Sequence, residues 1–325
     1  DLTISLSDEK ALTMEQGLAD TLDSSSAVHS WGAFYTKSTT LYNEEGGSAD
    51  VSIVGAEDDA RMTEYFTFRT RVGHDPIPFE EDSVILTEKT ALNLGLSVGD
   101  TFYVEAADGS RVPLVLTGIT ENYMFTRLYL SNAQLQALLG STPEWNTVYG
   151  LTGCATEAEY NALRTKLLGC NYVSSVSFTE DTTSMFGSLI GSLNYVVVLI
   201  IVCAAALAAV VLYNLISVNL AERKKELATI KVLGFYDKEV YRYIFREIEL
   251  LSLIGSGVGL LLGVPLHRFI ILTVEMDQLM FIRTIAPRSY LLAVALTMLF
   301  TVVVCFAMRR HVRHISMVES MKAPE

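Results

Sequence analysis

Residues 189–215 read LIGSLNYVVVLIIVCAAALAAVVLYNL, and this stretch decides the architecture of the chain. It forms the centre of a run of 40 residues between Asp181 and Glu222 that contains no charged side chain. About 20 apolar residues are enough for a helix to cross the hydrocarbon core of a bilayer. The run therefore predicts a membrane-spanning helix over 189–215, and a buried helix of a soluble protein is a poor explanation at this length.

Two further apolar stretches follow toward the C-terminus. The second span is predicted over 248–270, with His267 and Arg268 near the membrane boundary or facing other helices, because a charge at the centre of a span is costly. The third span is predicted over 290–308, where Tyr290 to Met308 are 19 residues without a charge. The sequence thus predicts an all-α transmembrane domain of three helices over residues 188–325.

Basic residues in the short loops predict the orientation of these spans. Seven Lys and Arg residues lie between the first and second spans, four follow the third span, and two lie between the second and third. The positive-inside rule therefore predicts a multi-pass protein of the cell membrane with a cytoplasmic loop at 217–246 and a cytoplasmic tail at 309–325. Residues 1–187 and the loop 275–288 are then extracytoplasmic.

The charge of the chain divides at the same place. Residues 1–187 hold 10 Lys and Arg against 27 Asp and Glu, whereas residues 188–325 hold 14 against 10. Global disorder is excluded because half of the residues are hydrophobic. The acidic front, and basic residues placed beside apolar spans, argue against nucleic-acid binding. They indicate a water-facing domain followed by a membrane domain in contact with lipid.

Residues 1–187 show short alternating runs between helical stretches, which is typical of an α+β domain. Strands are predicted at Leu2–Leu6, Val28–Tyr35, Val51–Val54, Val84–Leu86, Thr101–Glu105, Leu114–Ile119, Arg127–Leu130 and Tyr172–Phe178. Helices are predicted at Met14–Leu22, Glu88–Leu94, Asn132–Leu139 and Glu157–Leu168. Asp108-Gly109 predicts a hairpin turn, and Pro113 is placed just before its strand because it has no N–H for the ladder.

The sequence shows no recognisable catalytic or metal-binding constellation. His29 and His74 have no partners at metal-ligand spacing, and no HExxH or CxxC motif occurs. The acidic runs 57–59 and 80–82 are better explained as solvated loops than as a cation site. The chain is therefore expected to be no enzyme and to need no cofactor.

Two cysteines flank a predicted helix in the extracytoplasmic part. Cys154 and Cys170 lie 16 positions apart. Positions at the two ends of a helix can come close enough for a disulfide, but their spacing does not establish the geometry. A Cys154–Cys170 bridge and two free buried thiols both remain open.

The loop 217–246, which we call the elbow, has the pattern of two helices joined at a glycine. Its apolar residues recur at helical spacing between charged residues. Gly234 stands where a glycine ends a helix, and Asp237 is a candidate N-cap for the next one. The pattern favours a docking surface, although a solvated loop that merely satisfies the positive-inside rule is the alternative. The candidate docking residues are Glu222, Arg223, Glu226, Leu227, Ile230 and Gly234.

The elbow also carries a longer motif. Residues 221–234, AERKKELATIKVLG, resemble the ER-x-x-E-[LI]-A-x-[IL]-[KR]-x-[LM]-G motif of FtsX-like, MacB-type ABC transporter permeases. In that family an extracytoplasmic domain precedes three closing spans, and the motif follows the first of them, which is the order found here. The segments 84–100 and 118–120 resemble the family's outer domain, and 318–322 resembles its usual ending.

This resemblance implies a MacB-like periplasmic core for residues 1–187 and a permease subunit of an ABC transporter. A separate cytoplasmic ABC ATPase would dock on the elbow, and the spans would transmit its motion to the outer domain for export or extraction of a substrate. A second permease unit, in the same full-length chain or as a homodimer partner, is also implied. Complete members have a further span before the outer domain, so the chain is expected to be the C-terminal unit of a longer protein.

Three glycines in the second span recur every four residues: Gly255, Gly259 and Gly263. Small residues on one helix face let another span approach closely, so we expect them to serve helix packing, with a substrate-lining groove as the alternative. A nucleotide loop is excluded because the dinucleotide pattern needs a glycine where Leu260 stands, and no GxxxxGK[ST] motif occurs.

Two functions compete with the transporter. A membrane-anchored regulator would transmit ATPase motion to an extracellular hydrolase or a sensor kinase without net transport. A membrane enzyme with an outer active site would need a catalytic set that the sequence lacks. No sequence pattern identifies the substrate.

Overall fold

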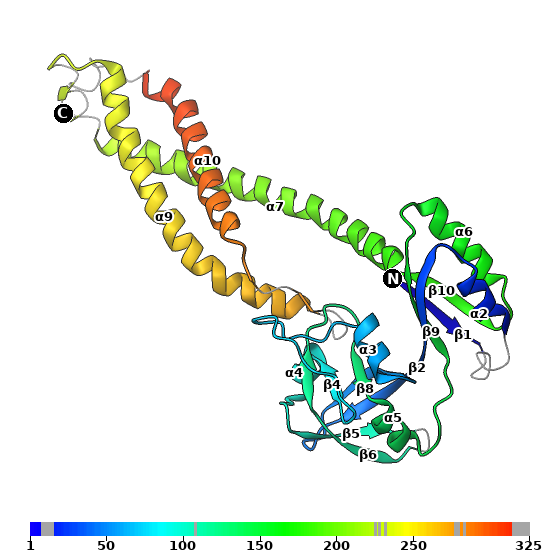
Figure 1. Cartoon of the computed structure of the whole chain (residues 1–325). Coiled ribbons are helices and arrows are strands. Elements are labelled where there is room, and N and C mark those ends of the chain that lie inside the picture. Colours follow the sequence, from blue (N-terminus) through cyan, green and yellow to red (C-terminus); the bar gives the residue numbers. More distant parts are fainter. Residues whose placement is uncertain are drawn as a thin grey trace. The chain divides into compact units, whose positions relative to one another are not determined.

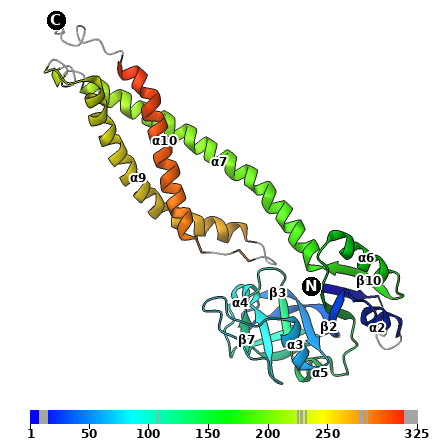
Figure 2. The same ribbon diagram turned by 45° about the horizontal axis from the view of Figure 1, so that its top comes forward.

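A computed structural model describes residues 1–7, 16–106, 109–223, 226, 229–230, 233–275, 280–281 and 284–313. The chain divides into two compact units, which Figures 1 and 2 show as a sheet with short helices and a set of long helices. Asp1–Gly187 and Glu275–Phe281 form the first, which we call the sheet unit. Ser188–Val274 and Ile282–Glu325 form the second, which we call the helical unit.

The sheet unit is built on a mixed sheet of ten strands. Eight of them follow the order β10-β1-β9-β2-β3-β8-β4-β7, while β5 pairs with β2 and with β6. The pairs β3/β8 and β4/β7 are parallel, and the other pairs are antiparallel. The strands are β1 Leu2–Leu6, β2 Val28–Tyr42, β3 Ser48–Ala56, β4 Val84–Thr87, β5 Thr101–Glu105, β6 Arg111–Val115, β7 Gly118–Thr120, β8 Arg127–Leu130, β9 Thr147–Thr152 and β10 Val173–Phe178.

Short helices cover the sheet and close its hydrophobic clusters. They are α2 Gln16–Asp23, α3 Asp59–Tyr65, α4 Glu88–Leu94, α5 Asn132–Leu139 and α6 Glu157–Leu168. One cluster joins Leu22 of α2 and Leu167 of α6 to Ile4 of β1. A capping box fixes the start of α6, because the side chains of Thr156 and Glu159 each accept a backbone N–H of the other residue.

Most predicted elements of this unit are confirmed, and β5, β8, α4, α5 and α6 have the predicted bounds. The predicted strand Leu114–Ile119 is wrong in extent, because Leu116 and Thr117 leave it to donate their N–H groups to Asp100 and Val84. The chain therefore forms β6 and β7 instead of one strand. Pro113 lies inside β6 rather than before it, which is tolerated because β6 pairs with β5 alone among the described strands.

Two elements are absent from the prediction. The strand β9 lies between β1 and β2, and Gly150 in its middle breaks the alternation that marks a strand in a sequence. The helix α3 begins in the acidic run 57–59, which the sequence pattern assigns to a loop. There the Asp58 side chain caps α3 by accepting the Ala60 N–H.

The helical unit contains three long helices: α7 Thr179–Glu222, α9 Asp237–Val274 and α10 Pro287–Arg313. Within the described residues, three segments are long and apolar enough to cross a membrane: Asn194–Asn219, Phe245–Val274 and Pro287–Ala307. They confirm the three predicted spans. A buried cluster of Ile216, Val240, Ile248 and Cys305 joins the three helices, and the Ser252 and Thr301 hydroxyls hydrogen-bond at 2.6 Å between α9 and α10.

The helix α7 starts in the sheet unit, where Thr179 directly follows the last residue of β10. The Asp181 carboxylate accepts the Phe178 N–H at 3.0 Å and pairs with Arg164 of α6. From there α7 continues for 44 residues into the helical unit. The same helix therefore carries residues of both units.

Candidate functional site

The elbow contains the helix stop that the sequence predicts. The helix α7 ends at Glu222, and a further helical turn is closed by the Leu233 N–H, which donates to the Thr229 carbonyl at 3.0 Å. Gly234 follows with φ of +95°, the left-handed conformation that glycine adopts without strain. The positive φ of Gly234 therefore ends this helical turn before α9 begins.

The start of α9 differs from the prediction by one position. Asp237 is the first residue of the helix rather than its N-cap. The Tyr236 N–H donates to the Glu239 carboxylate at 3.0 Å, and the Glu239 N–H donates to the Tyr236 carbonyl at 2.9 Å. Tyr236 therefore occupies the N-cap position that the sequence pattern assigns to Asp237, and the Glu239 side chain accepts its N–H.

The charged residues of the elbow fall into two groups. The Arg223 guanidinium holds the Glu247 carboxylate of α9 with two hydrogen bonds, of 2.8 and 3.1 Å. Glu222 and Glu226 are exposed. Arg223 is therefore committed to the chain's own second helix, whereas Glu222 and Glu226 remain available to a partner.

Ile230, an apolar residue of the elbow, is less exposed to a partner than Glu222 and Glu226. Ile230 is half-buried and packs against the cluster of Ile216, Val240 and Ile248. The sequence pattern assigns Ile230 to a partner surface, whereas in the structure it packs against residues of α7 and α9. Leu227 lies outside the described residues.

Gly255, Gly259 and Gly263 all lie in α9. A Cβ atom built on any of them would meet no atom of the described chain within 4 Å. Within the part of the chain that the structure describes, no neighbouring helix therefore fills this face.

The structure contains Cys154 and Cys170 as free thiols, and both partly buried side chains pack against the hydrophobic cluster that includes residues of α6 and β1. Burial raises the pKa of the Cys154 thiol, and the nearby Glu159 carboxylate raises it further. The Cys170 thiol lies 3.7 Å from the Thr21 hydroxyl. A bridge between the two cysteines stays a prediction.

A short segment between α9 and α10 belongs to the sheet unit, although the sequence pattern assigns it to the transmembrane domain. This segment, Glu275–Phe281, we call the return segment. The Lys89 ammonium of α4 lies 3.1 Å from the Glu275 carboxylate. The buried Met280 donates its N–H to the Tyr123 carbonyl at 3.0 Å. The return segment is thus fixed at both ends by contacts within the sheet unit.

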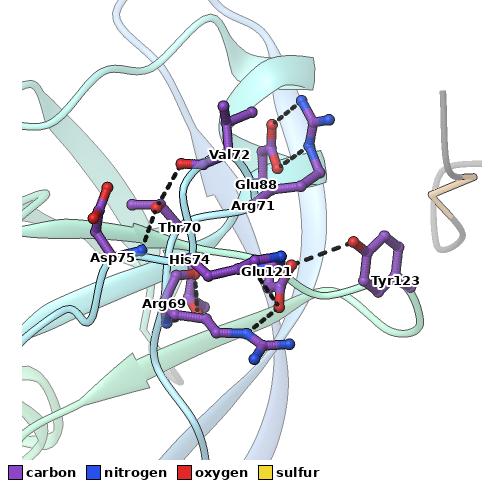
Figure 3. A network of polar contacts seen from close by, with 10 residues as sticks. Arg69, Thr70, Arg71, Val72, His74, Asp75, Glu88, Glu121 and Tyr123 are labelled. Atoms are coloured by element: carbon purple, nitrogen blue, oxygen red, sulfur yellow. Dashed lines mark hydrogen bonds and ion pairs between the residues drawn. The ribbon is translucent and has the colours of Figure 1, made fainter. Parts of the chain in front are cut away.

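A polar network surrounds Tyr123, one of the two residues that contact the return segment. Figure 3 shows Arg69, His74 and Tyr123 around the carboxylate of Glu121, whose side chain is only 7% exposed. Arg69 forms an ion pair with Glu121, and the Tyr123 hydroxyl donates to it at 3.2 Å. Burial raises the pKa of the Tyr123 phenol, and the Glu121 charge adds to the shift. The network therefore fixes Tyr123, to which the return segment is bonded.

A second ion pair adjoins Lys89, the other of these two residues. Arg71 grips Glu88 with two hydrogen bonds, of 2.8 and 2.9 Å, and Glu88 directly precedes Lys89 in α4. These charged groups match a structural role. Among the described residues there is no group of three or more His, Cys, Asp or Glu side chains that could hold a metal ion.

Solved extracytoplasmic domains of transporters are similar to the front of the chain. The periplasmic region of MacB from Actinobacillus actinomycetemcomitans is 12% identical with a TM-score of 0.36, covering 57% of this chain and 92% of that one. The extracellular domain of the noncanonic ABC-type transporter YknZ from Gram-positive bacteria is 14% identical with a TM-score of 0.34, covering 55% and 98%. No curated protein sequence matches the chain.

The helical unit gives the assignment. Residues 198–317 match the family model of the FtsX-like permease C-terminal domain. The match includes the elbow and most of the three apolar helices, so the chain is a multi-pass membrane protein. Residues 198–317 are therefore an FtsX-like permease C-terminal domain, the family that the elbow motif of the sequence resembles.

Proposed function

We propose that the chain is the permease subunit of an ABC transporter and couples the movements of a separate cytoplasmic ATPase to the sheet unit, for export or extraction of a substrate. The ATPase activity belongs to the partner, and the chain itself transmits force. The continuity of α7 is the observation that carries this proposal.

The helix α7 links the two regions that such coupling must join. It begins at Thr179 beside β10 and ends at Glu222 in the elbow without an interruption. At a rise of 1.5 Å per residue, its 44 residues span about 66 Å. An unbroken ladder of backbone hydrogen bonds passes a displacement along its axis better than a chain with a loop in its middle.

The return segment supports the same proposal. It connects α9 to α10 and is part of the sheet unit. The three long helices are therefore connected to the sheet unit at two places in the chain: at Thr179, where α7 begins, and at Glu275–Phe281. Two attachments allow the helical unit to change the strain in the sheet unit when its helices shift.

The elbow is suited to receive the partner because some of its described residues contact α7 and α9 while others are exposed. Ile230 and the Arg223–Glu247 pair hold it against α7 and α9. The exposed Glu222 and Glu226 can pair with individual basic side chains of the ATPase. Gly234 fixes the direction in which the second helix leaves.

The orientation in the membrane is part of the proposal. The sheet unit lies outside the cell, and the elbow and the C-terminal tail lie in the cytoplasm, because the elbow has the excess of Lys and Arg. Single cysteines are placed at 109, 277 and 224 in a chain whose four native cysteines are replaced by serine. A membrane-impermeant maleimide should label positions 109 and 277 in sealed cells and spare position 224. Strong labelling at 224 would contradict the orientation.

The open glycine face of α9 offers a surface for a second permease unit. Because no described residue fills it, we assign it to a second permease unit, whose helix would pack on Gly255, Gly259 and Gly263.

Co-purification tests the docking proposal. The full-length permease is expressed with its ATPase, and complex yield and ATP turnover are measured for Glu226→Lys and for Glu45→Lys. Both glutamates are exposed, but Glu45 lies in the sheet unit, so it is a matched control. Glu226→Lys should lower the yield severalfold while Glu45→Lys leaves it unchanged. Equal yields for the two variants would show that the elbow does not bind the ATPase.

A further inference from the structure

A cavity of about 540 Å³ lies on one face of the sheet in the sheet unit. The strand register shows how it is built, because residues paired across neighbouring strands point to the same face. Thr3 is opposite both Ser177 and Tyr149, and Ser52 is opposite Arg127. All five of these residues line the cavity. It therefore extends across the sheet from β10 to β8, and its volume is that of a site for one small molecule.

Arg127 provides the positive charge of the cavity. The centre of its guanidinium lies 5.6 Å from the ring of Phe66, 5.8 Å from that of Tyr149 and 5.9 Å from that of Phe125. Among the described residues no carboxylate forms an ion pair with it, although the chain is strongly acidic. Burial raises the pKa of the adjacent Tyr129 phenol, and the Arg127 charge opposes that rise. Arg127 is thus a cation enclosed by aromatic rings without an anion.

The acidic residue that lines the cavity is already neutralised. Glu121 pairs with Arg69 and accepts a hydrogen bond from Tyr123, so it does not compensate Arg127. The charge that the cavity presents is therefore positive. A half-buried guanidinium that has no ion-pair partner among the described residues favours the binding of an anion, because charge-assisted hydrogen bonds are strong where water is partly excluded.

One further observation indicates a ligand in this cavity. Phe125 lines it, with a ring that is half exposed and a backbone φ of +64°. The Asn122 amide donates to the Phe125 carbonyl at 3.2 Å and holds this conformation. A strained backbone that presents an exposed ring next to a cation is typical of a binding site.

We propose that this cavity binds an anionic small molecule with an apolar body, whose carboxylate or phosphate meets Arg127 while its body lies on Phe66, Phe125 and Tyr149. The other end of the cavity is lined by hydroxyl groups of α7, from Thr179, Thr182 and Thr183. These hydroxyls form hydrogen bonds with polar groups of the same ligand. The proposal concerns binding alone and does not depend on the coupling to an ATPase.

Calorimetry on the full chain in nanodiscs of zwitterionic lipid tests the proposal. The probes are 2-naphthoate and 2-naphthyl phosphate, with 2-naphthylmethylammonium as the cation of matched shape, and heats from empty nanodiscs are subtracted. We expect saturable binding with one site per chain for at least one of the two anions, and the stronger of them identifies the head group. The ammonium should bind at least about tenfold more weakly. Absence of saturable binding by both anions, or equal affinity for the ammonium, would overturn the proposal.

Variants then locate the binding site. Arg127→Gln should weaken the anion by roughly tenfold or more, the usual consequence of losing a hydrogen bond to a charged group. Arg111→Gln is the matched control, since Arg111 lies over the ring of Tyr42 at 3.7 Å but does not line the cavity. Unchanged binding by Arg127→Gln would overturn the proposal. If circular dichroism shows that this variant is unfolded, Phe125→Ala replaces it: a severalfold loss of affinity supports the site, and unchanged affinity overturns it.

Discussion

The Lys89 ammonium lies 3.1 Å from the Glu275 carboxylate, and these two side chains are 12% and 2% exposed. Lys89 belongs to α4, whereas Glu275 directly follows the last residue of α9. Glu275 also accepts the Phe281 N–H at 3.1 Å. This buried pair therefore holds the start of the return segment, and through Glu275 its end as well.

Removing one partner of this pair should loosen the return segment. An uncompensated charge in a buried site costs about 3–5 kcal/mol. We expect Glu275→Gln and Lys89→Met each to lower the free energy of local opening by about 3 kcal/mol, and the double variant to cost less than the sum. Hydrogen exchange of the Met280 amide measures the opening. Lys37→Met, at an exposed lysine of β2, is the control and should leave exchange unchanged. Additive effects in the double variant would show that the two charges do not interact.

Gly234 should be intolerant of β-branched residues because of its backbone and not because of crowding. Its φ is +95°, and an added Cβ would meet nothing within 4 Å. The left-handed conformation costs an ordinary residue about 1–2 kcal/mol. Gly234→Val should therefore speed amide exchange at Phe235, whose N–H is bonded to the Ile230 carbonyl. Gly234→Asn should have a smaller effect, since asparagine adopts this conformation more readily. Identical exchange in the two variants would contradict the backbone explanation.

The glycine face of α9 should be required for assembly and not for folding. Gly259→Leu fills the open face with a side chain, whereas Gly257→Leu places the same side chain on a different face of the same helix. Both changes favour helix formation by about 1 kcal/mol, so neither should unfold the chain. Light scattering of the detergent-purified protein should show a severalfold loss of the two-unit assembly for Gly259→Leu alone. Equal loss in both variants would remove the special role of this face.

If the sheet unit faces an oxidising compartment, Cys154 and Cys170 should form a bridge. Both thiols pack against one hydrophobic cluster at the two ends of α6, and closing a loop of this length stabilises a fold by about 3 kcal/mol. Mass spectrometry of the non-reduced protein should find the two peptides linked. Alkylation of both thiols without reductant would leave them as free, partly buried cysteines, and Cys154 should then react slowly because burial raises its thiol pKa.

The parts of this fold that local patterns determine could be predicted from the sequence. The span 189–215 needs only its own hydrophobicity, and α6 is marked by Thr156 and Glu159, which lie three residues apart and cap each other. β9 could not be predicted, because a central strand with Gly150 in its middle shows no alternation. Its place depends on β1 and β2, to which it pairs.

The contacts that matter for function are harder to predict, because they join residues that are distant in the chain. Nothing near Lys89 in the sequence indicates that its partner is Glu275, and nothing near Arg127 indicates Tyr149. The elbow shows the same limit at shorter range. Its charge pattern is visible in the sequence, but the turn at Gly234 brings Arg223 to Glu247, which leaves fewer charges for a partner than the pattern suggests.

Hydrogen exchange of the Met280 amide in the complex of full-length permease and ATPase tests the coupling most directly. Its N–H bond to Tyr123 reports the return segment, which belongs to the sheet unit, whereas nucleotide acts on the ATPase. We predict that protection of this amide differs between the nucleotide-free and ATP-bound complexes. Glu226→Lys should abolish the difference, and Glu45→Lys should preserve it. Identical protection in both states, while ATP is hydrolysed at the normal rate, would contradict the account.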